Sequence, residues 1–264
     1  MKIHQLFLHP VKSFAAQSVN SLTYDSIGPI FDRNWMVVNP EGKALTQRVL
    51  PKMCLVTCTL DGKKLILNAE EMPKISVNEP TKLKEVTIWS DTVEAGDCGD
   101  EVADWLSTYL GKPARLVRVT EQTNRQIDQN FAAPNELVGF ADGFPTLIVS
   151  QASLDEFNSH METQTKTKID MRRFRPNIVI AGCEPFAEDS WSAVRIGEIE
   201  FSLVKPCSRC IMPSINPDNG EKEMQVNQVL LATRRRNRET YFGQNATHKG
   251  EGTISIGDSV ELIS

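Results

Sequence analysis

Short apolar and β-branched segments of strand length recur from one end of the chain to the other. Turn-forming residues separate them, as in NPEGK at 39–43, LDGKK at 60–64 and NPDNGE at 216–221. Because Gly, Pro, Asn and Asp favour turns, this pattern predicts a chain rich in β-strands. The expected strands cover residues 3–8, 34–39, 54–60, 63–68, 86–90, 114–119, 145–150, 177–182, 193–204 and 253–263.

Two segments have instead the apolar spacing of amphipathic helices. Residues 100–111 repeat apolar side chains at helical intervals and stop at Gly111, whereas residues 150–161 begin at Ser150, a candidate N-cap. Residues 222–233 carry a weaker helical pattern. We therefore expect a β-rich α+β fold with a few flanking helices, built either as a barrel or as two packed sheets.

A seam in the chain is expected near residues 111–145. The stretch EQTNRQIDQNFAAPNE at 121–136 is polar and lacks apolar periodicity. Irregular loops of this length are uncommon inside compact domains. Two interpretations remain open, namely an ordered functional loop and a disordered lid.

Composition narrows the possible classes of function. The 264 residues are enough for a substantial core, and 40% apolar with 24% charged residues is typical of soluble globular proteins. A net charge of −5 argues against a general nucleic-acid or membrane-surface binder, which needs a broadly positive face. The sequence has no apolar run of 18 residues, and polar residues interrupt the N-terminal segment, so neither a membrane span nor a secretory signal is expected. Six irregularly spaced cysteines favour free thiols and a cytoplasmic location.

The stretch KPCSRCIMPSINPD at 205–218 holds the most distinctive chemistry, because Cys207 and Cys210 flank a Ser-Arg pair. A structural zinc site needs four ligands. The other close pair, Cys54 and Cys58, would lie ~13 Å apart along a strand, and the four histidines are scattered singly. Zinc is therefore disfavoured.

Three interpretations of this cysteine pair remain open. A thioredoxin-type dithiol usually begins a helix, which Pro213 and Pro217 prevent here. The two cysteines could instead be partly buried structural residues. A single thiolate could also ligate a soft metal beside the cationic Arg209, which would require other anion-binding residues elsewhere in the chain.

A series of motifs resembles the MOSC-domain family. They are HPVKS (9–13), DRNWMVV (32–38), FADGFPTLIVSQASL (140–154), RFRPNIVIAG (173–182), EDSW (188–191), KPCSRC (205–210), YFGQN (241–245) and GTISIGDSVEL (252–262). Within that family they are similar to the bacterial YcbX-type N-hydroxylated-compound reductases and to the mitochondrial amidoxime-reducing component. The motifs occur in the family's order, so the resemblance covers essentially the whole chain.

The resemblance implies an N-terminal MOSC-associated β-barrel-like domain over residues 1–118 and a MOSC β-barrel over 119–264, with a molybdenum cofactor (Mo-molybdopterin) between them. In the family one protein thiolate binds the molybdenum, and the matching position is Cys210, whereas Cys207 is read as structural or adjacent to the site. The positions that match the family's cofactor-binding residues are Lys12, Ser13, Arg33, Gly143, Phe144, Arg175, Asn177, Ser208, Arg209 and Asn245.

Elementary electrostatics agrees with this residue set. A phosphomonoester such as the molybdopterin tail carries about −1.5 to −2 charges at neutral pH. A protein with a net charge of −5 must gather cations locally to hold such a group. Lys12 supplies a point charge, and Arg33 can bind phosphate or pterin through two parallel hydrogen bonds. Arg175 and Asn177 form a second Arg/Asn pair, which the intervening Pro176 directs toward one site.

The function that the resemblance implies is the molybdenum-dependent reduction of N-hydroxylated compounds, such as hydroxylaminopurines or amidoximes. Longer bacterial relatives carry a four-cysteine [2Fe–2S] domain, and no such spacing occurs here, so we expect no iron–sulfur cluster in this chain. Electrons are then expected from a separate flavodoxin-, ferredoxin- or cytochrome-type protein. The basic run at 233–239 is expected to be an exposed face or a docking patch for that donor.

Two other classes of function remain open. The chain could be a sulfur-carrier or molybdenum-cofactor-handling module that uses a cysteine persulfide. It could also be a binding protein without catalytic activity.

Overall fold

The computed structural model describes residues 1–263, which form a β-rich α+β fold with three α-helices and confirm the predicted fold class. None of the helices within these residues is long and apolar enough to cross a membrane. The elements are β1 (Lys2–Leu8), β2 (Gln17–Val19), β3 (Ser21–Tyr24), β4 (Trp35–Val38), η1 (Pro51–Leu55), β5 (Thr57–Asp61), β6 (Lys64–Asn68), β7 (Ile75–Ser76), β8 (Lys82–Ile88), β9 (Asp91–Asp97), α1 (Asp100–Leu110), β10 (Arg115–Arg118), β11 (Thr146–Ser150), α2 (Gln151–Thr165), η2 (Met171–Phe174), β12 (Ile178–Ala181), η3 (Ala187–Ser190), β13 (Ala193–Ile196), β14 (Ile199–Ser208), η4 (Met212–Ser214), α3 (Gln225–Arg234), β15 (Arg235–Arg236), β16 (Glu239–Lys249), β17 (Gly252–Ser255) and β18 (Val260–Ile263).

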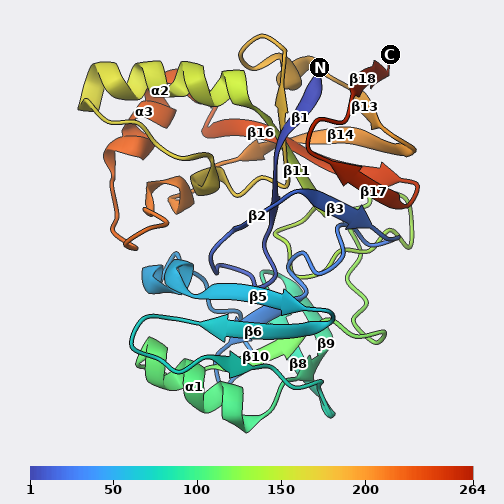
Figure 1. Cartoon of the computed structure of the whole chain (residues 1–264), viewed down its shortest axis with the longest axis vertical. Helices are drawn as coiled ribbons and strands as arrows, with labels where there is room; N and C mark the ends of the chain where they lie inside the picture. Colours follow the sequence, from blue (N-terminus) through green and yellow to red (C-terminus); the bar gives the residue numbers. More distant parts are fainter. Residues whose placement is uncertain (264) are drawn as a thin grey trace.

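The elements are arranged in two bodies (Figure 1). The lower body contains β4 to β10 with α1, and the upper body contains β1 to β3, β11 to β18, α2 and α3. The first strands of the chain therefore pair with its later half, since β1 pairs with β12 and β3 pairs with β17. The proposed domain boundary between residues 118 and 119 stays a prediction.

The upper body is built on one large sheet with the strand order β18-β13-β14-β16-β11-β12-β1-β2. The β11 and β12 strands are parallel, and α2 forms the crossover that parallel neighbours require. The sheet is curved, as two contacts between its ends show. An isolated bridge joins Lys2 to Ser259, and the Ile3 N–H donates to the Asp258 carbonyl at 2.9 Å. This curvature brings β1 back to the residues that precede β18.

Aromatic packing beneath α2 and α3 links the upper core to the ends of η2 and β16. The Phe174 and Phe242 rings stack with their centroids 3.8 Å apart, and Phe157 from α2 packs edge-on against both. Each fully buried side chain of this kind contributes about 1.5–3 kcal/mol of burial free energy. The pair fixes the positions of the polar residues that follow Phe174 and Phe242 in the chain.

The predicted helices are confirmed, with small shifts in their ends. The α1 helix ends at Gly111, whose φ of 67° is the left-handed conformation that favours glycine. The Ser150 side chain caps α2 by accepting the Ser153 N–H at 3.1 Å. The α3 helix spans Gln225–Arg234, within the segment that had the weaker helical pattern.

The prediction of one strand over residues 54–60 is wrong. Residues 51–55 form the short helix η1, which Pro51 initiates, and the strand β5 starts only at Thr57. Proline favours the first position of a helical turn because its fixed φ suits that turn and its missing N–H is not needed there. Cys54 and Cys58 consequently lie on different elements.

The long strand β16 was not predicted from the sequence. Several of its buried positions are polar, including Thr240, Gln244 and Thr247, so the apolar alternation of a strand is absent. A hydrogen bond of 2.8 Å from Gln244 Nε2 to Asp189 Oδ1 satisfies one of these groups. Gly243 adopts a φ of 79°, and a Cβ there would lie 2.6 Å from Val149 Cγ2, so β16 needs glycine to approach β11.

The irregular segment 119–145 is an ordered loop rather than a free lid. The Arg125 side chain is buried, and its guanidinium donates to the carbonyls of Gly139 at 2.9 Å and of Asp142 at 3.1 Å. Its Nε also donates to Asp91 Oδ2 at 2.7 Å. Arg125 thus fixes the residues before β11 against the β8–β9 hairpin of the lower body.

Candidate cofactor and active site

A cavity of about 640 Å³ lies where segments of both halves of the chain meet. This volume is within the range of small-molecule and cofactor sites, about 300–1,000 Å³. All the site residues predicted from the sequence line it, although they are spread from residue 12 to residue 245. They are Lys12, Ser13, Arg33, Gly143, Phe144, Arg175, Asn177, Ser208, Arg209, Cys210 and Asn245.

The cavity wall is strongly cationic in a chain whose net charge is −5. Eight lining residues are Lys or Arg, and only two are acidic. The cations are Lys12, Arg33, Arg48, Arg173, Arg175, Lys205, Arg209 and Arg238, and the acids are Asp142 and Glu239. Low-dielectric walls lined by one sign of charge concentrate ligands of the opposite sign, so the cavity is suited to an anion.

Arg33 is held by a dense network at the buried end of the cavity. Its Nη1 donates to Asp32 Oδ2 at 2.5 Å and to Asn177 Oδ1 at 3.0 Å, and its Nη2 donates to the Arg175 carbonyl at 3.0 Å. Asn177 Oδ1 also accepts the Leu147 N–H at 3.2 Å. The role of Asn177 in this structure is therefore to orient Arg33 from the start of β12.

Arg175 retains donor capacity that faces no protein acceptor. Its Nη1 donates to the Phe14 carbonyl at 2.7 Å, but its buried Nη2 has no hydrogen-bond partner among the described residues. Burial, reinforced by the charge of Arg33, lowers the pKa of Arg175 to about 10, so the side chain still carries its charge at neutral pH. An unpaired buried donor is costly, and an anionic ligand would satisfy it.

Lys12 and Asp142 form an ion pair that faces the hollow. Lys12 Nζ lies 2.5 Å from Asp142 Oδ1 and donates to the Phe140 carbonyl at 2.9 Å. Burial lowers the pKa of Lys12 despite the nearby carboxylate. Surrounding protein disfavours ionisation of Asp142, but the charges of Lys12 and Arg48 together lower its pKa. Asp142 therefore remains an anion, and its side chain is 65% exposed.

Three of the cationic and hydroxyl residues hold strained backbone conformations. Ser13, Arg33 and Arg175 have φ values of 71°, 48° and 55°, in the left-handed region that L-residues other than Asn and Asp rarely adopt. Such outliers cost of order 1–3 kcal/mol each and cluster at functional sites. Their convergence on one cavity is a second indication of function that is independent of charge.

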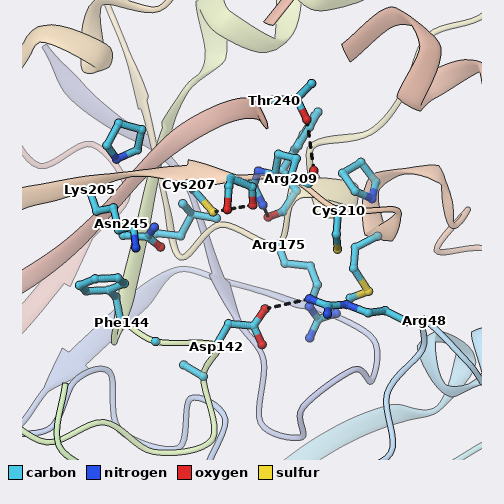
Figure 2. A pocket seen from close by; sticks show the side chains of 18 of the residues that line it. Arg48, Asp142, Phe144, Arg175, Lys205, Cys207, Arg209, Cys210, Thr240 and Asn245 are labelled. Carbon is cyan, nitrogen blue, oxygen red and sulfur yellow. Dashed lines mark hydrogen bonds and ion pairs between the residues drawn. The ribbon is translucent and has the colours of Figure 1, made fainter. Parts of the chain in front are cut away.

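Cys210 lies on the cavity wall just beyond the end of β14. Figure 2 shows its side chain pointing into the hollow, toward the side where Arg48, Arg175 and Asp142 lie. Arg209 positions this residue, because its guanidinium donates to the Phe242 carbonyl at 2.6 Å and to the Phe174 carbonyl at 3.0 Å. The thiol of Cys210 is exposed, so a ligand entering the cavity can reach it.

Cys207 has a different environment from Cys210. It packs against the hydrophobic cluster under α2 and α3, and Figure 2 shows Asn245 beside it. Burial raises the pKa of the Cys207 thiol, although the charge of Arg209 opposes the shift. The thiol of Cys207 is therefore the less available of the two for metal binding.

The remaining predicted residues complete the wall. Phe144 meets Phe131 edge-on with ring centroids 5.8 Å apart, while Gly143 borders open space. Ser208 is the last residue of β14 and lies on the exposed side of the wall.

Sequence reasoning missed several cavity residues. Arg48 and Trp89 come from the lower body, Arg173 from η2, and Arg238 from the β15–β16 hairpin. Arg238 belongs to the basic run that was predicted to be an exposed face or a docking patch. Arg173 begins the motif RFRPNIVIAG but was not assigned to the site, whereas Arg48 and Trp89 lie in no family motif. An isolated Arg such as Arg48 in a polar segment is usually a solvated surface charge.

A buried histidine beside the arginines gives the site a testable pH dependence. His9 Nε2 lies 3.0 Å from the Pro176 carbonyl, to which it donates, and Nδ1 has no partner among residues 1–263. Burial, with the charges of Arg33 and Arg175, lowers the pKa of His9 well below 6.5. The folded protein therefore keeps this imidazole neutral at pH values where the unfolded chain binds a proton.

His9→Gln is expected to reduce the acid sensitivity of folding. As the pH falls below 6.5, the unfolded wild-type chain takes up a proton that the folded chain does not. This difference removes about 1.4 kcal/mol of unfolding free energy for each pH unit. Urea unfolding at roughly pH 7.5 and 5.5 measures the slope. An identical slope in the variant would assign the acid sensitivity to other groups and contradict the prediction.

The residues present fit an anionic, pterin-type molybdenum cofactor. The excess of cations and the unpartnered Arg175 Nη2 suit a phosphate tail, and the accessible Cys210 thiol suits a soft metal. Among residues 1–263 no three His, Cys, Asp or Glu side chains are grouped around a possible metal position.

The chain belongs to the MOSC-domain family. The family model described as the MOSC N-terminal beta barrel domain matches residues 1–113, and the MOSC domain model matches residues 135–261. The chain is 33% identical to mitochondrial amidoxime-reducing component 1 of Homo sapiens over 282 residues, covering 99% of this chain and 82% of that protein. It is 31% identical to the Mus musculus protein of the same name, with the same coverage.

A second group of relatives carries a different name. The molybdenum cofactor sulfurase of Homo sapiens is 29% identical over 253 residues, which cover 88% of this chain but only 28% of that longer protein. The similarity to both groups confirms the predicted family and, at a coarse level, an association with molybdenum-cofactor biochemistry.

Proposed function

We propose that this chain is a molybdenum-cofactor-dependent oxidoreductase that reduces N-hydroxylated compounds, such as amidoximes or hydroxylaminopurines. The observation that carries the proposal is the single cavity in which the accessible Cys210 thiol lies together with Lys12, Arg33 and Arg175. The relatives named amidoxime-reducing component support the same reaction class. Reduction of an N–OH group to N–H consumes two electrons and two protons and releases water.

The residues of this chain would hold the cofactor and contact the ligand. Cys210 would ligate the metal, and Lys12, Arg33 and Arg175 would hold the anionic tail. The bound cofactor would supply the two-electron chemistry, while the protein supplies position and electrostatics. Asp142 stays ionised and can accept, but not donate, a hydrogen bond toward a ligand.

Metal and cofactor analysis tests the proposal directly. Protein produced with molybdate in a host that makes molybdopterin is expected to contain stoichiometric molybdenum and to release a fluorescent pterin on oxidation. With a chemical reductant it is expected to convert benzamidoxime to benzamidine. Fully loaded protein that leaves several amidoximes and N-hydroxylated bases unchanged would refute the proposed reaction.

The basic run is proposed to receive a separate, acidic electron-transfer protein. Arg235, Arg236 and Arg238 are exposed on the β15–β16 hairpin, and Arg238 also lines the cavity. Complementary charge at the rim of an interface mainly raises the association rate.

Arg235→Glu is expected to raise the KM for an acidic flavodoxin- or cytochrome-type donor by about fivefold at low salt, because reversing a rim charge slows association. Arg235 lies outside the cavity lining, so turnover with a small viologen reductant is expected to stay unchanged. Lys63→Glu, in the exposed β5–β6 turn, is the matched control. Equal effects of both changes on the donor KM would argue against a docking patch.

The sulfur-carrier alternative rests on the presence of two thiols, Cys207 and Cys210, in one cavity and on the sulfurase relatives. Mass spectrometry of protein incubated with a sulfur donor tests it. A persulfide on either residue, combined with no turnover of N-hydroxylated compounds, would favour this function over the reductase.

A further inference from the structure

Trp89 occupies a backbone position that disfavours its side chain. In the β8–β9 hairpin Ile88 pairs with Asp91, so Trp89 and Ser90 form a two-residue turn. Trp89 has a φ of 56°, and a first turn position with positive φ is normally occupied by glycine, asparagine or aspartate. A bulky residue with positive φ is an outlier that the surrounding structure must impose. The strained backbone at this position indicates that the indole side chain has a function that glycine could not provide.

The side chain of Trp89 does not pack in the hydrophobic core. It is 45% exposed, and it belongs to none of the hydrophobic clusters formed within residues 1–263. Tryptophan normally stabilises a fold by burying a large apolar surface. This indole instead lines the cavity that contains Cys210. The part of its surface that Lys12 and Arg48 leave exposed is therefore available to a ligand.

The turn that carries Trp89 is held firmly against the loop that leads into β11. Asp91, two residues further along, accepts the Arg125 Nε–H at 2.7 Å. Arg125 in turn donates to the carbonyls of Gly139 and Asp142 at 2.9 and 3.1 Å. The hairpin tip and the loop that carries Asp142 are thus tied through one buried guanidinium. A rigid support of this kind preorganises a binding surface.

Trp89 is more exposed than the cationic groups that suit the cofactor, and Lys12 of that group lies beside its ring. Lys12 is 6% exposed and Asn177 is 1% exposed, so the anion-binding end is buried, whereas Trp89 stands at the accessible rim. The Arg48 guanidinium lies 4.4 Å and Lys12 Nζ 5.3 Å from the indole centroid. These cation–π contacts further fix the ring. A substrate entering from solvent meets this rim before it reaches the buried end.

We propose that Trp89 is a specificity-determining residue that stacks against the ring of planar aromatic N-hydroxylated compounds, such as aryl amidoximes and N-hydroxylated purine bases. The inference rests on the proposed function and adds a residue that selects among its substrates. Stacking on an aromatic side chain accepts any planar π-face, so it selects flat ring systems over aliphatic compounds without selecting one particular ring. The turn strain is retained because glycine, which suits the backbone, offers no ring.

Trp89→Gly tests the proposal with little risk to folding, because glycine suits the backbone at this position. With cofactor-loaded protein and a chemical reductant, the ratio of kcat/KM for benzamidoxime to that for acetamidoxime is expected to fall about tenfold, mostly through KM. Trp89→Phe is expected to recover most of that ratio. Glu71→Gly is the matched control, because Glu71 is an exposed turn residue with a φ of 62° outside the cavity. It is expected to leave the ratio unchanged.

The outcomes separate this inference from the proposed function. An unchanged ratio in Trp89→Gly, or equal losses on both substrates together with a lower Tm, would overturn the stacking role. Loss of molybdenum from Trp89→Gly would also overturn it, by assigning the ring to cofactor retention. A loaded wild-type protein that reduces neither substrate would instead remove the proposed function. A selective tenfold loss with molybdenum retained would support the assignment.

Discussion

Cys210→Ala is expected to abolish the reduction of N-hydroxylated compounds, lowering kcat/KM by about a thousandfold or more, which corresponds to at least about 4 kcal/mol of transition-state stabilisation. The physical reason is that Cys210 is the accessible thiol on the wall of the cationic cavity, where it would ligate the metal. Alanine offers no donor atom. Because the Cys210 side chain is exposed, the variant is expected to keep the Tm of the wild type.

Two further cysteine variants sharpen this test. Cys183→Ala removes a half-buried thiol outside the cavity and is expected to retain full activity. Cys207→Ala changes the neighbour that packs on the hydrophobic cluster and is expected to cost less than tenfold, through small shifts in packing. Steady-state assays with one aryl amidoxime and a chemical reductant measure all three. Activity retained in Cys210→Ala, or lost equally in Cys207→Ala, would contradict the single-ligand role.

The elements that could be predicted from the sequence are those in which apolar periodicity reports burial. The α1 and α2 helices have a clear apolar face with end signals at Gly111 and Ser150, and the structure confirms both. The strand β16 lacks that signal because its interior includes Gln244, whose amide is paired with Asp189. Its partner lies far away in the chain, so no local pattern could indicate that a glutamine there would be buried.

Among the cavity residues, too, those in a sequence motif could be predicted, whereas those placed only by tertiary contacts could not. The family motifs could name Lys12, Arg175 and Cys210 because motifs preserve residue types in order, and the fold brings these residues together. Trp89 could not be found in this way, because the run VTIWS predicts a strand through residue 90. The strand β8 ends instead at Ile88, which leaves the indole at the tip of a turn. Only the pairing of β8 with β9 shows where that ring points.

Arg175→Gly is expected to lower the molybdenum content of purified protein more than tenfold without unfolding it. The guanidinium provides the buried Nη2 donor that has no acceptor among the described residues, and it follows η2 with a φ of 55°. Glycine adopts that φ without strain, so the backbone is expected to keep its course. What is lost is a charge-assisted contact to an anionic tail, a class of hydrogen bond roughly twice as strong as a neutral one.

Lys166→Gly is the matched control for this variant, because it also removes one positive charge at a left-handed position, with a φ of 62° at the C-terminus of α2 and outside the cavity. Metal analysis and thermal unfolding of both proteins, produced side by side with molybdate, give the two readouts. The control is expected to match the wild type in both, whereas Arg175→Gly is expected to lose molybdenum and to lower the Tm by only a few degrees, because the Phe14 carbonyl loses its donor. Equal molybdenum in the two variants would mean that the anionic tail does not depend on Arg175, and the cationic end of the cavity would then need another ligand to account for its strained backbone and its unpaired donor.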